Sequence, residues 1–376
     1  MYFNYRLFLK AEYLSLFRLP FRIRRWAYVI LFSSLFLLFL AFVMFARALD
    51  HLFFPGFRRQ RVSQPVFIIA PPRSGTTLVQ NLLSMDEDRF VHLKLYQTIF
   101  PSVCCERLLQ AAARLDRMVG SPLEKLFAWC EKKWFGGWDE MHKLRFNQPE
   151  EDDALFLYAF ESEAIFLLFP FINELWEAGF PDALPPEERR KLMRYYRSCL
   201  QRHLYGNAPD KTLLSKATQS SGTLESLLEE FPDARFITIV RHPYASVASH
   251  VSLFVPVWQT HSPEITRDGP TSQAYARLAV EWYKHLFAFR NQVNPRQYYC
   301  IDYRDLVSNP SDVIHKLYAH FNWPVSDKYR ACIETATKRQ REFKSKHEYT
   351  LEEFGLTRHW IQQELGEVLD AYGLER

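Results

Sequence analysis

The sequence of 376 residues lacks several patterns that would restrict its function. Its six cysteines show no CxxC pair and no Cys/His spacing of a zinc site, and they are too few for a disulfide framework. No Asn-X-Ser/Thr acceptor is present, because Asn309-Pro310-Ser311 carries the excluded proline. The net charge of +4 is too small for an extended nucleic-acid surface. These absences favour a reducing compartment, no metal and no nucleic-acid partner.

The chain is rich in apolar and aromatic residues, which make up 48% and 16% of the sequence, and this composition indicates a folded protein. Residues 26–46 form an uncharged run that would reach about 30 Å as a helix, the thickness of a hydrocarbon core. Basic residues flank the run on both sides, so the positive-inside rule does not orient it. We therefore expect residues 1–61 to be a retained membrane anchor, either a spanning helix or a helix lying in one leaflet.

The rest of the chain, residues 62–376, alternates short apolar runs with helical patterns. Strands that alternate with helices predict one α/β domain with a central parallel sheet. About 140 residues of mainly helical pattern separate the first two runs, which is too long for one crossover. We expect a helical insertion there, at about residues 95–205. The runs that indicate buried strands are residues 66–70, 211–215, 235–240 and 298–301.

The segment APPRSGTTL, residues 70–78, lies between the first predicted strand and a helical stretch. Backbone N–H groups and the helix dipole make such a junction an anion site, and Gly75 lets the backbone approach a ligand closely. Against the GxxxxGK[ST] pattern of nucleoside-triphosphate loops, Ala70 replaces the first glycine and Thr76 replaces the lysine, which disfavours ATP hydrolysis. Arg73 supplies positive charge from within the loop. The alternative interpretation of the whole segment is an ordinary turn between a strand and a helix that binds no anion. Hydroxyl donors come from Ser74, Thr76 and Thr77.

This loop resembles the 5'-phosphosulfate loop, PxSGTT, of the sulfotransferase superfamily, in the arginine-bearing version of its bacterial and tyrosylprotein branches. That family also carries an Arg and a Ser eight positions apart, which hold the 3'-phosphate of 3'-phosphoadenosine-5'-phosphosulfate (PAPS). Arg241 and Ser249 have this spacing after a predicted strand. The resemblance implies a P-loop-like, three-layer domain. Stretches similar to the bacterial branch that acts on lipids and other small alcohols are residues 146–156, 301–310 and 347–357.

The resemblance also implies catalytic roles. Arg73 and the loop amides would neutralise charge on the leaving phosphate, and Lys216 matches the family lysine that reaches the transferring group. Soluble members use a histidine after that lysine's strand as the base, but the segment KATQSSG has none. A glutamate of the run PEEDD is the other option, with Glu151 ahead of Glu150, and His142 is the option that is not a carboxylate.

Several of these residues also have plainer interpretations. Acidic residues in a first helical turn stabilise the helix dipole and need no catalytic duty. Lys216 could be a solvated surface lysine. The basic run of residues 341–347 either covers the 3'-phosphate or is a solvated face. No role is assigned to His92, His203 and His250.

The sequence therefore predicts a membrane-anchored, PAPS-dependent sulfotransferase that requires no metal and acts on a hydroxyl of a lipid, amphipathic or other small acceptor. Its helical insertion would shape the acceptor pocket, and its catalytic domain would face the cytoplasm of a bacterium. A nucleotide-dependent phosphotransferase of the same architecture and an inactive nucleotide-binding membrane scaffold remain as alternatives. The predicted catalytic residues are Arg73, Lys216 and Glu151. The predicted donor-binding residues are Arg73, Ser74, Gly75, Thr76, Thr77, Arg241 and Ser249.

Overall fold

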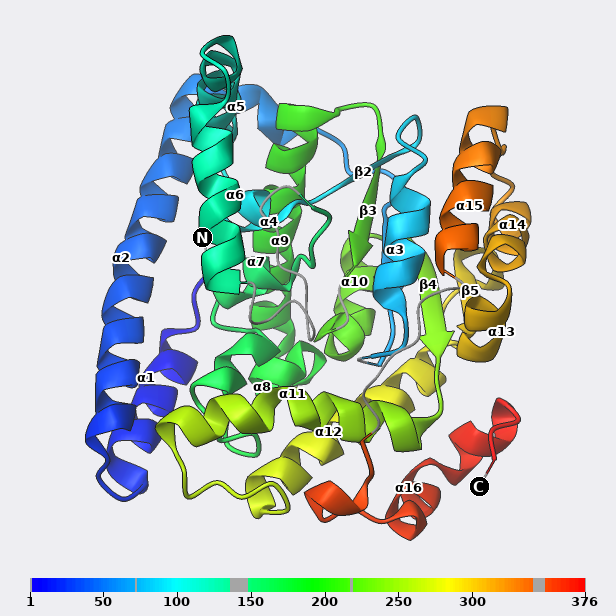
Figure 1. Cartoon of the computed structure of the whole chain (residues 1–376). Coiled ribbons are helices and arrows are strands. Elements are labelled where there is room, and N and C mark those ends of the chain that lie inside the picture. Colours follow the sequence, from blue (N-terminus) through cyan, green and yellow to red (C-terminus); the bar gives the residue numbers. More distant parts are fainter. Residues whose placement is uncertain (1, 72, 136–147, 217–218, 341–348, 376) are drawn as a thin grey trace.

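A five-stranded parallel sheet in the order β2-β3-β1-β4-β5 lies at the centre of the molecule, with helices on both faces (Figure 1). The computed structural model describes the chain except for residues 1, 72, 136–147, 217–218, 341–348 and 376. The predicted α/β class with a central parallel sheet is confirmed. The strands are β1 Val66–Ile69, β2 Phe90–His92, β3 Thr212–Lys216, β4 Arg235–Val240 and β5 Tyr298–Asp302.

Helices make up most of the remaining described chain. They are α1 Tyr5–Tyr13, α2 Ile23–Phe53, α3 Thr76–Ser84, α4 Leu95–Ile99, α5 Val103–Met118, α6 Pro122–Phe135, α7 Asp153–Leu157, α8 Trp176–Gly179, α9 Pro186–Asn207, α10 Leu224–Glu230, α11 Pro243–His261, α12 Pro270–Phe289, α13 Tyr303–Ser308, α14 Pro310–His320, α15 Asp327–Gln340 and α16 Arg358–Ala371.

The two faces of the sheet pack against two separate cores because side chains alternate along a strand. Val66 and Ile68 of β1 pack in a core formed with α3, α13, α14 and α15. Phe67 and Ile69 join a larger core that includes residues of α7 to α12. All four side chains are fully buried, as the uninterrupted apolar run VFII requires. The result is the three-layer arrangement that the family resemblance implies.

The structure adds one strand to the four predicted ones. This strand, β2, has only the three residues Phe90–His92, and it pairs with the start of β3 at the edge of the sheet. Three residues are too few to form an apolar pattern that would identify a strand in the sequence. Helices α4 to α9 lie between β2 and β3 in the chain, where the sequence predicts a helical insertion.

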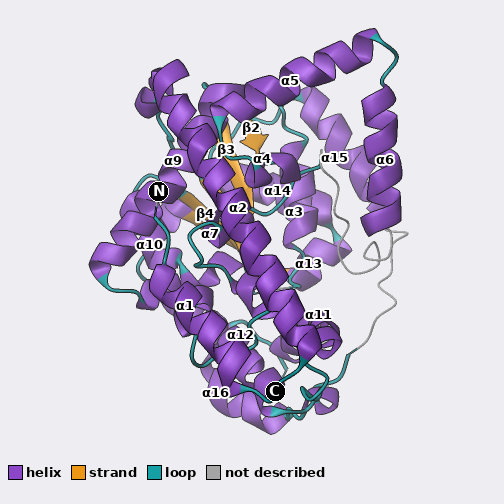
Figure 2. Ribbon diagram, turned by 90° about the vertical axis from the view of Figure 1, so that its left-hand side faces the viewer, coloured by secondary structure: helices purple, strands orange, loops and turns teal. Residues whose placement is uncertain are grey.

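The apolar N-terminal run lies within α2, which has 31 residues and extends along one side of the domain (Figure 2). Within the described chain, α2 is the one helix long and apolar enough to cross a membrane, judged by length and composition. The predicted apolar helix is therefore confirmed. One face of it is buried, since Val29, Phe36, Leu40 and Val43 belong to the larger core of the domain.

Candidate active site

A tight turn connects β1 to α3. Arg73 and Gly75 in this turn have positive φ angles of 64° and 87°, and α3 begins at Thr76. A Cβ atom on Gly75 would lie 3.2 Å from side-chain carbons of both Leu306 and Tyr303, so glycine alone fits without adjustment. The first amides of α3 have no partners within the helix, and they can therefore bind an anion at this end.

The two residues of the second motif lie beside this turn. The Arg241 guanidinium donates to the carbonyl oxygen of Arg73 and lies over the ring of Tyr303, 4.7 Å from its centroid. The Tyr283 hydroxyl donates to the Arg241 carbonyl oxygen at 2.8 Å. Nε of Arg73 donates to Oγ of Ser249 at 3.3 Å. Burial, and then the charge of Arg241, lower the pKa of Arg73, as expected where two cations share a site suited to an anion.

Lys216 ends β3 and is almost fully buried, with 2% of its side chain exposed. Its Nζ lies 2.9 Å from Oε1 of Glu151 and donates to Oγ1 of Thr77 at 3.1 Å. Lys216 is therefore not a solvated surface lysine. The carboxylate of Glu150 accepts a hydrogen bond from the main-chain N–H of Glu151 at 3.0 Å, so it turns back onto the backbone. The two glutamates, of which the sequence ranks Glu151 ahead of Glu150, thus have different surroundings.

Two buried aspartates follow Glu151, and the first of them, Asp152, ties the segment to the sheet. Asp152 accepts hydrogen bonds from Oγ of Ser215 at 2.7 Å and from the Tyr196 hydroxyl. Burial raises the pKa of Asp152 to about 6. Burial, and then the charge of Glu151, raise the pKa of Asp153 well above its ordinary value. Among the described residues no group of His, Cys, Asp and Glu side chains is arranged to hold a metal ion.

The chain also matches known proteins over most of its length. A model of the sulfotransferase family matches residues 65–327, well over half of the chain. The chain belongs to this family. Two relatives of this sulfotransferase, from Mycobacterium bovis and Mycobacterium tuberculosis, are named omega-hydroxy-beta-dihydromenaquinone-9 sulfotransferase Stf3. Each is 27% identical over 331 residues, which cover 83% of this chain and 76% of the relative.

Solved structures share the fold of this sulfotransferase. Sulfotransferase STF9 from Mycobacterium avium matches with a TM-score of 0.70 and 20% identity, over 88% of this chain and 82% of STF9. Sulfotransferase STF1 from Mycobacterium tuberculosis matches with a TM-score of 0.59 and 19% identity, over 86% of this chain and 81% of STF1. The predicted family, enzyme class and use of a sulfonate donor are confirmed, and the two alternatives find no support in these matches.

A buried pair of residues near this site was not predicted. His250 follows Ser249 on α11, and its Nε2 lies 2.8 Å from Oε1 of Glu163. The Tyr275 hydroxyl donates to the same carboxylate. Burial raises the pKa of Glu163, whereas His250 lowers it. The available sequence signal is a glutamate followed directly by the apolar stretch AIFLLF, because a carboxylate buried there needs a partner.

The other candidate groups fall in two classes. His142 and the basic run of residues 341–347 lie outside the described residues. His92 and His203 are uncharged, because burial lowers the pKa of His92 to about 4 and that of His203 to about 3. The described chain thus offers Glu151 and the pair of Glu163 and His250 as groups able to accept a proton near the loop.

Proposed function

We propose that this sulfotransferase moves the sulfuryl group of PAPS onto the hydroxyl of a lipid, amphipathic or other small acceptor, and that it works at a membrane. The observation that carries the proposal is the set of contacts at the carboxyl ends of three adjacent strands. Arg73, Arg241 and Ser249 meet there, and Lys216 is hydrogen-bonded to Thr77 of the same loop. Ligands of open α/β sheets bind at this edge.

The residues present fit a donor that carries phosphate at two ends. The loop amides, together with the hydroxyls of Ser74, Thr76 and Thr77, would hold the 5'-phosphosulfate, since Gly75 leaves room for close approach of the backbone. Arg241 and Ser249 would hold the 3'-phosphate. When bound, PAPS supplies an activated sulfuryl group and a phosphate leaving group. Nε of Arg73 donates to Oγ of Ser249, so the charge of Arg73 would lie between the two ends of the donor.

The acceptor proton has to leave as the new sulfur–oxygen bond forms and the bond to the phosphate breaks. We propose that Glu151 accepts this proton. Nζ of Lys216, 2.9 Å from the Glu151 carboxylate, would offset negative charge on the leaving phosphate. The hydrogen bond from Ser215 to Asp152 holds the acidic segment against β3 and keeps Glu151 at this position.

The acceptor is proposed to be a lipid alcohol. The Stf3 relatives are named for a hydroxylated dihydromenaquinone. The predicted helical insertion of this chain also exposes large apolar side chains, among them Leu108, Leu115 and Trp129. We place the catalytic domain on the cytoplasmic side of a bacterial membrane, the side that holds the nucleotide donor.

Calorimetric titration of the full chain in detergent tests the donor site. We expect 3'-phosphoadenosine 5'-phosphate to bind more tightly than adenosine 5'-phosphate and ATP. Arg241→Ala should weaken that binding by roughly 10- to 100-fold, because a hydrogen bond from a charged group is lost. Arg296→Ala, which removes an exposed arginine before β5, serves as the matched control. Equal binding of the three nucleotides, or none at all, would contradict the proposal.

A further inference from the structure

Both ends of α2 are fixed to the catalytic domain by buried polar contacts. Near its start, the fully buried Arg25 donates to Oγ of Ser262 at 2.9 Å and pairs with Glu264. Near its end, the fully buried Asp50 accepts hydrogen bonds from Nε of Arg202 at 2.7 Å and from Oγ of Ser102 at 2.8 Å. Buried charges that lose such partners cost several kcal/mol, on the order of 3–5. The helix is therefore held along the domain at both ends.

The segment that precedes α2 contacts the same domain. The backbone N–H of Asn4 donates to the carbonyl oxygen of Ala159 at 2.9 Å, and its side chain donates to Glu161 at 2.6 Å. Arg18 pairs with Glu174. A helix that crossed a bilayer would place the segments before and after it about 30 Å apart, on opposite sides. The observed contacts cannot form in that arrangement.

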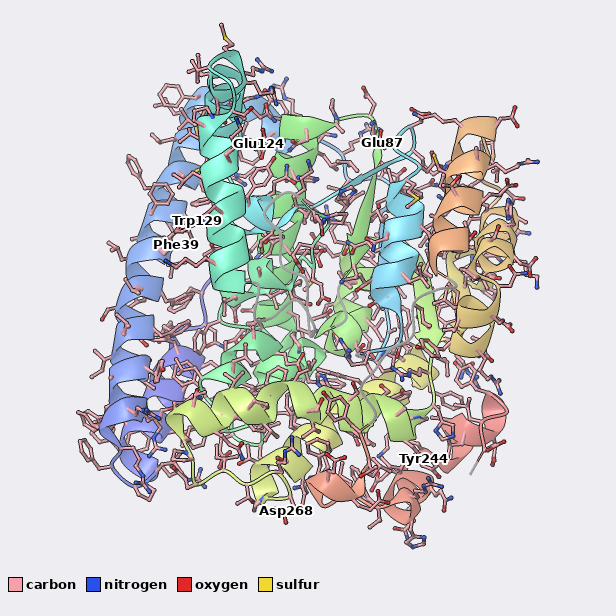
Figure 3. The ribbon with its side chains drawn as sticks, in the orientation of Figure 1. Phe39, Glu87, Glu124, Trp129, Tyr244 and Asp268 are labelled. Atoms are coloured by element: carbon pink, nitrogen blue, oxygen red, sulfur yellow. The ribbon has the colours of Figure 1, made fainter. Side chains whose placement is uncertain are left out.

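The face of α2 that points away from the domain is apolar. No charged residue occurs between Arg25 and Arg47. The side chains of α2 project from the outer side of the molecule (Figure 3). Leu38, for example, is 70% exposed. Ring contacts join this face to the preceding segment through Phe17, which touches Trp26. Other large exposed side chains of α2 include Ile30, Leu31, Leu35, Leu37, Phe42, Met44 and Phe45.

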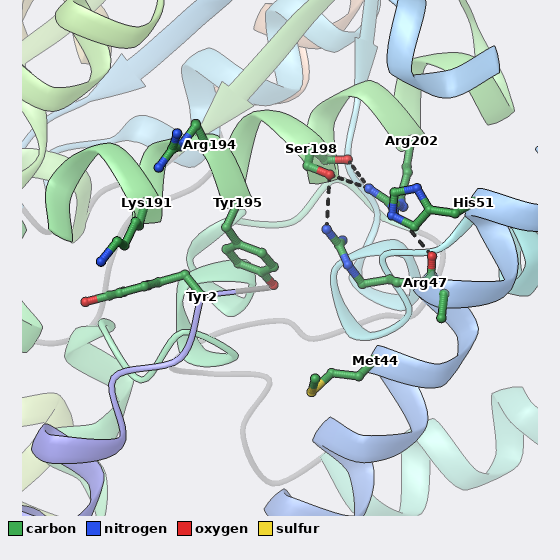
Figure 4. A pocket seen from close by; sticks show the side chains of 10 residues that line it. Tyr2, Met44, Arg47, His51, Lys191, Arg194, Tyr195, Ser198 and Arg202 are labelled. Atoms are coloured by element: carbon green, nitrogen blue, oxygen red, sulfur yellow. Dashed lines mark hydrogen bonds between the residues drawn. The ribbon is translucent and has the colours of Figure 1, made fainter. Parts of the chain in front are cut away.

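A basic cavity lies between α2, α9 and the N-terminal residues, beside this apolar face (Figure 4). It has a volume of about 490 Å³, and none of the residues that line it is acidic. Met44 of the exposed face belongs to its wall. Arg47 and Arg202 already bond to the protein, whereas Lys191 and Arg194 are exposed at the cavity. Positive charge next to an apolar surface is complementary to the phosphate and acyl chains of an anionic lipid.

We propose that α2 lies in the plane of an anionic membrane, embedded in one leaflet by its outer face, and that the basic cavity receives the phosphate of an anionic phospholipid. The chain then sits on one side of the membrane and does not cross it. This inference rests on the membrane association proposed above, but it does not depend on the identity of the donor or the acceptor.

Tags at the two ends of the full chain test the position of α2. In sealed inverted vesicles of a bacterial host, we expect external protease to remove both the N-terminal and the C-terminal tag. Protection of one tag and loss of the other would show a spanning helix and overturn the inference. A chain that stays soluble as a dimer would overturn it too, because the apolar face would then be covered by a second copy. Nucleotide binding in detergent is measured separately, so either failure leaves the proposed sulfuryl transfer open to its own test.

Charge placed on the outer face should release the protein from membranes. The double variant Leu31→Glu and Leu38→Glu should move most of the chain from the membrane pellet to the soluble fraction. Val307→Glu is the matched control, since Val307 is exposed on α13 at the far side of the sheet. A double variant that stays in the pellet like the control would contradict an embedded outer face.

Vesicle flotation tests the cavity. The charge reversals Lys191→Glu and Arg194→Glu should weaken binding to phosphatidylglycerol vesicles by roughly fivefold for each charge removed, or more, and leave binding to phosphatidylcholine vesicles unchanged. The matched control reverses Lys328 and Arg330, two exposed basic residues of α15, which lies on the opposite side of the sheet (Figure 1). Equal losses in the two double variants would show a general effect of net charge and remove the cavity from the inference.

Discussion

At Gly75, the absence of a side chain is proposed to let the backbone of the loop approach the PAPS donor closely. Replacing it with alanine should destabilise the fold by about 1 to 2 kcal/mol, because a side chain at positive φ is strained. The added Cβ would also press on Tyr303 and Leu306 at 3.2 Å. We therefore expect lower thermal stability together with weaker binding of 3'-phosphoadenosine 5'-phosphate, measured by melting and by calorimetry.

Gly366 of α16 is a suitable control for that substitution. A Cβ there meets no atom within 4 Å, and alanine is the better helix former. Gly366→Ala should leave stability unchanged or raise it by about 0.5 to 1 kcal/mol, with unaltered nucleotide binding. If Gly75→Ala behaved in the same way, the loop would tolerate a side chain and its close approach to a ligand would be unnecessary.

Glu151 is the residue that we expect to accept the acceptor's proton. Glu151→Gln keeps the volume and can still accept a hydrogen bond from Lys216, so the chain should fold normally. We expect kcat to fall by roughly 100-fold or more at saturating donor, with little change in nucleotide affinity. Glu150→Gln, which alters only the carboxylate that bonds to the backbone, should retain activity. If Glu151→Gln had a normal kcat, Glu151 would not accept the proton, and the pair of Glu163 and His250 would become the candidate for this role.

How far the site can be predicted from sequence depends on the distance along the chain. The loop around Gly75 can be predicted from the sequence because a strand, a turn and a helix N-terminus follow one another along the chain. The contacts between Lys216 and Glu151 and between His250 and Glu163 join segments far apart in the chain. Sequence patterns reflect only local structure, so they do not predict the contact between His250 and Glu163. For the partner of Lys216 they give Glu151 only as the first of several candidates.

The N-terminal segment docks through Glu161, and its docking should depend on pH. Burial raises the pKa of Glu161 to about 8, while the hydrogen bond from Asn4 lowers it. Between about pH 4.5 and pH 8 the folded chain therefore holds a proton that the unfolded chain releases, and stability falls as pH rises. The slope for this group is at most about 1.4 kcal/mol per pH unit.

Melting of wild type and Glu161→Gln from pH 5 to pH 8 checks this dependence. The neutral amide cannot ionise, so the variant should gain stability relative to wild type as pH rises. Glu187→Gln, at an exposed position in the first turn of α9, should run parallel to wild type. Parallel curves for Glu161→Gln as well would show that this carboxyl is not protonated in the folded chain.

At the scale of elements, sequence patterns predict strands and helices that carry a regular apolar pattern. They miss short strands and charged residues that are buried inside a helix. Four strands are predicted by their apolar runs, whereas β2 is too short to carry one. The predicted apolar run ends where charges appear, yet α2 continues from Ile23 to Phe53. Arg25, Arg47 and Asp50 lie inside this helix because the domain supplies partners for each of them. A hydropathy window scores these residues only as charged and takes no account of their partners, so it ends the apolar helix too early.

At the scale of the whole molecule, α1 and α2 contribute side chains to the larger core of the domain. Phe36 is buried, and its ring contacts those of Phe3, Phe8 and Phe160. Phe36→Ala should lower the free energy of unfolding by about 3 to 5 kcal/mol, as measured by denaturant titration in detergent. Leu38→Ala, on the opposite face of the same helix, should change it by less than about 0.5 kcal/mol. Equal effects at the two positions would mean that α2 is a detachable anchor.

The contact of Asp50 with Arg202 also has a consequence for biosynthesis. The two residues are 152 positions apart, so Asp50 leaves the ribosome long before its partner exists. During that interval α2 carries its apolar face and an unpaired carboxylate without the domain that will cover one side of it. Nascent chains with such exposed surface aggregate readily. We therefore expect early capture of the emerging helix by a membrane surface or a chaperone, and completion of the fold only after α9 has been made.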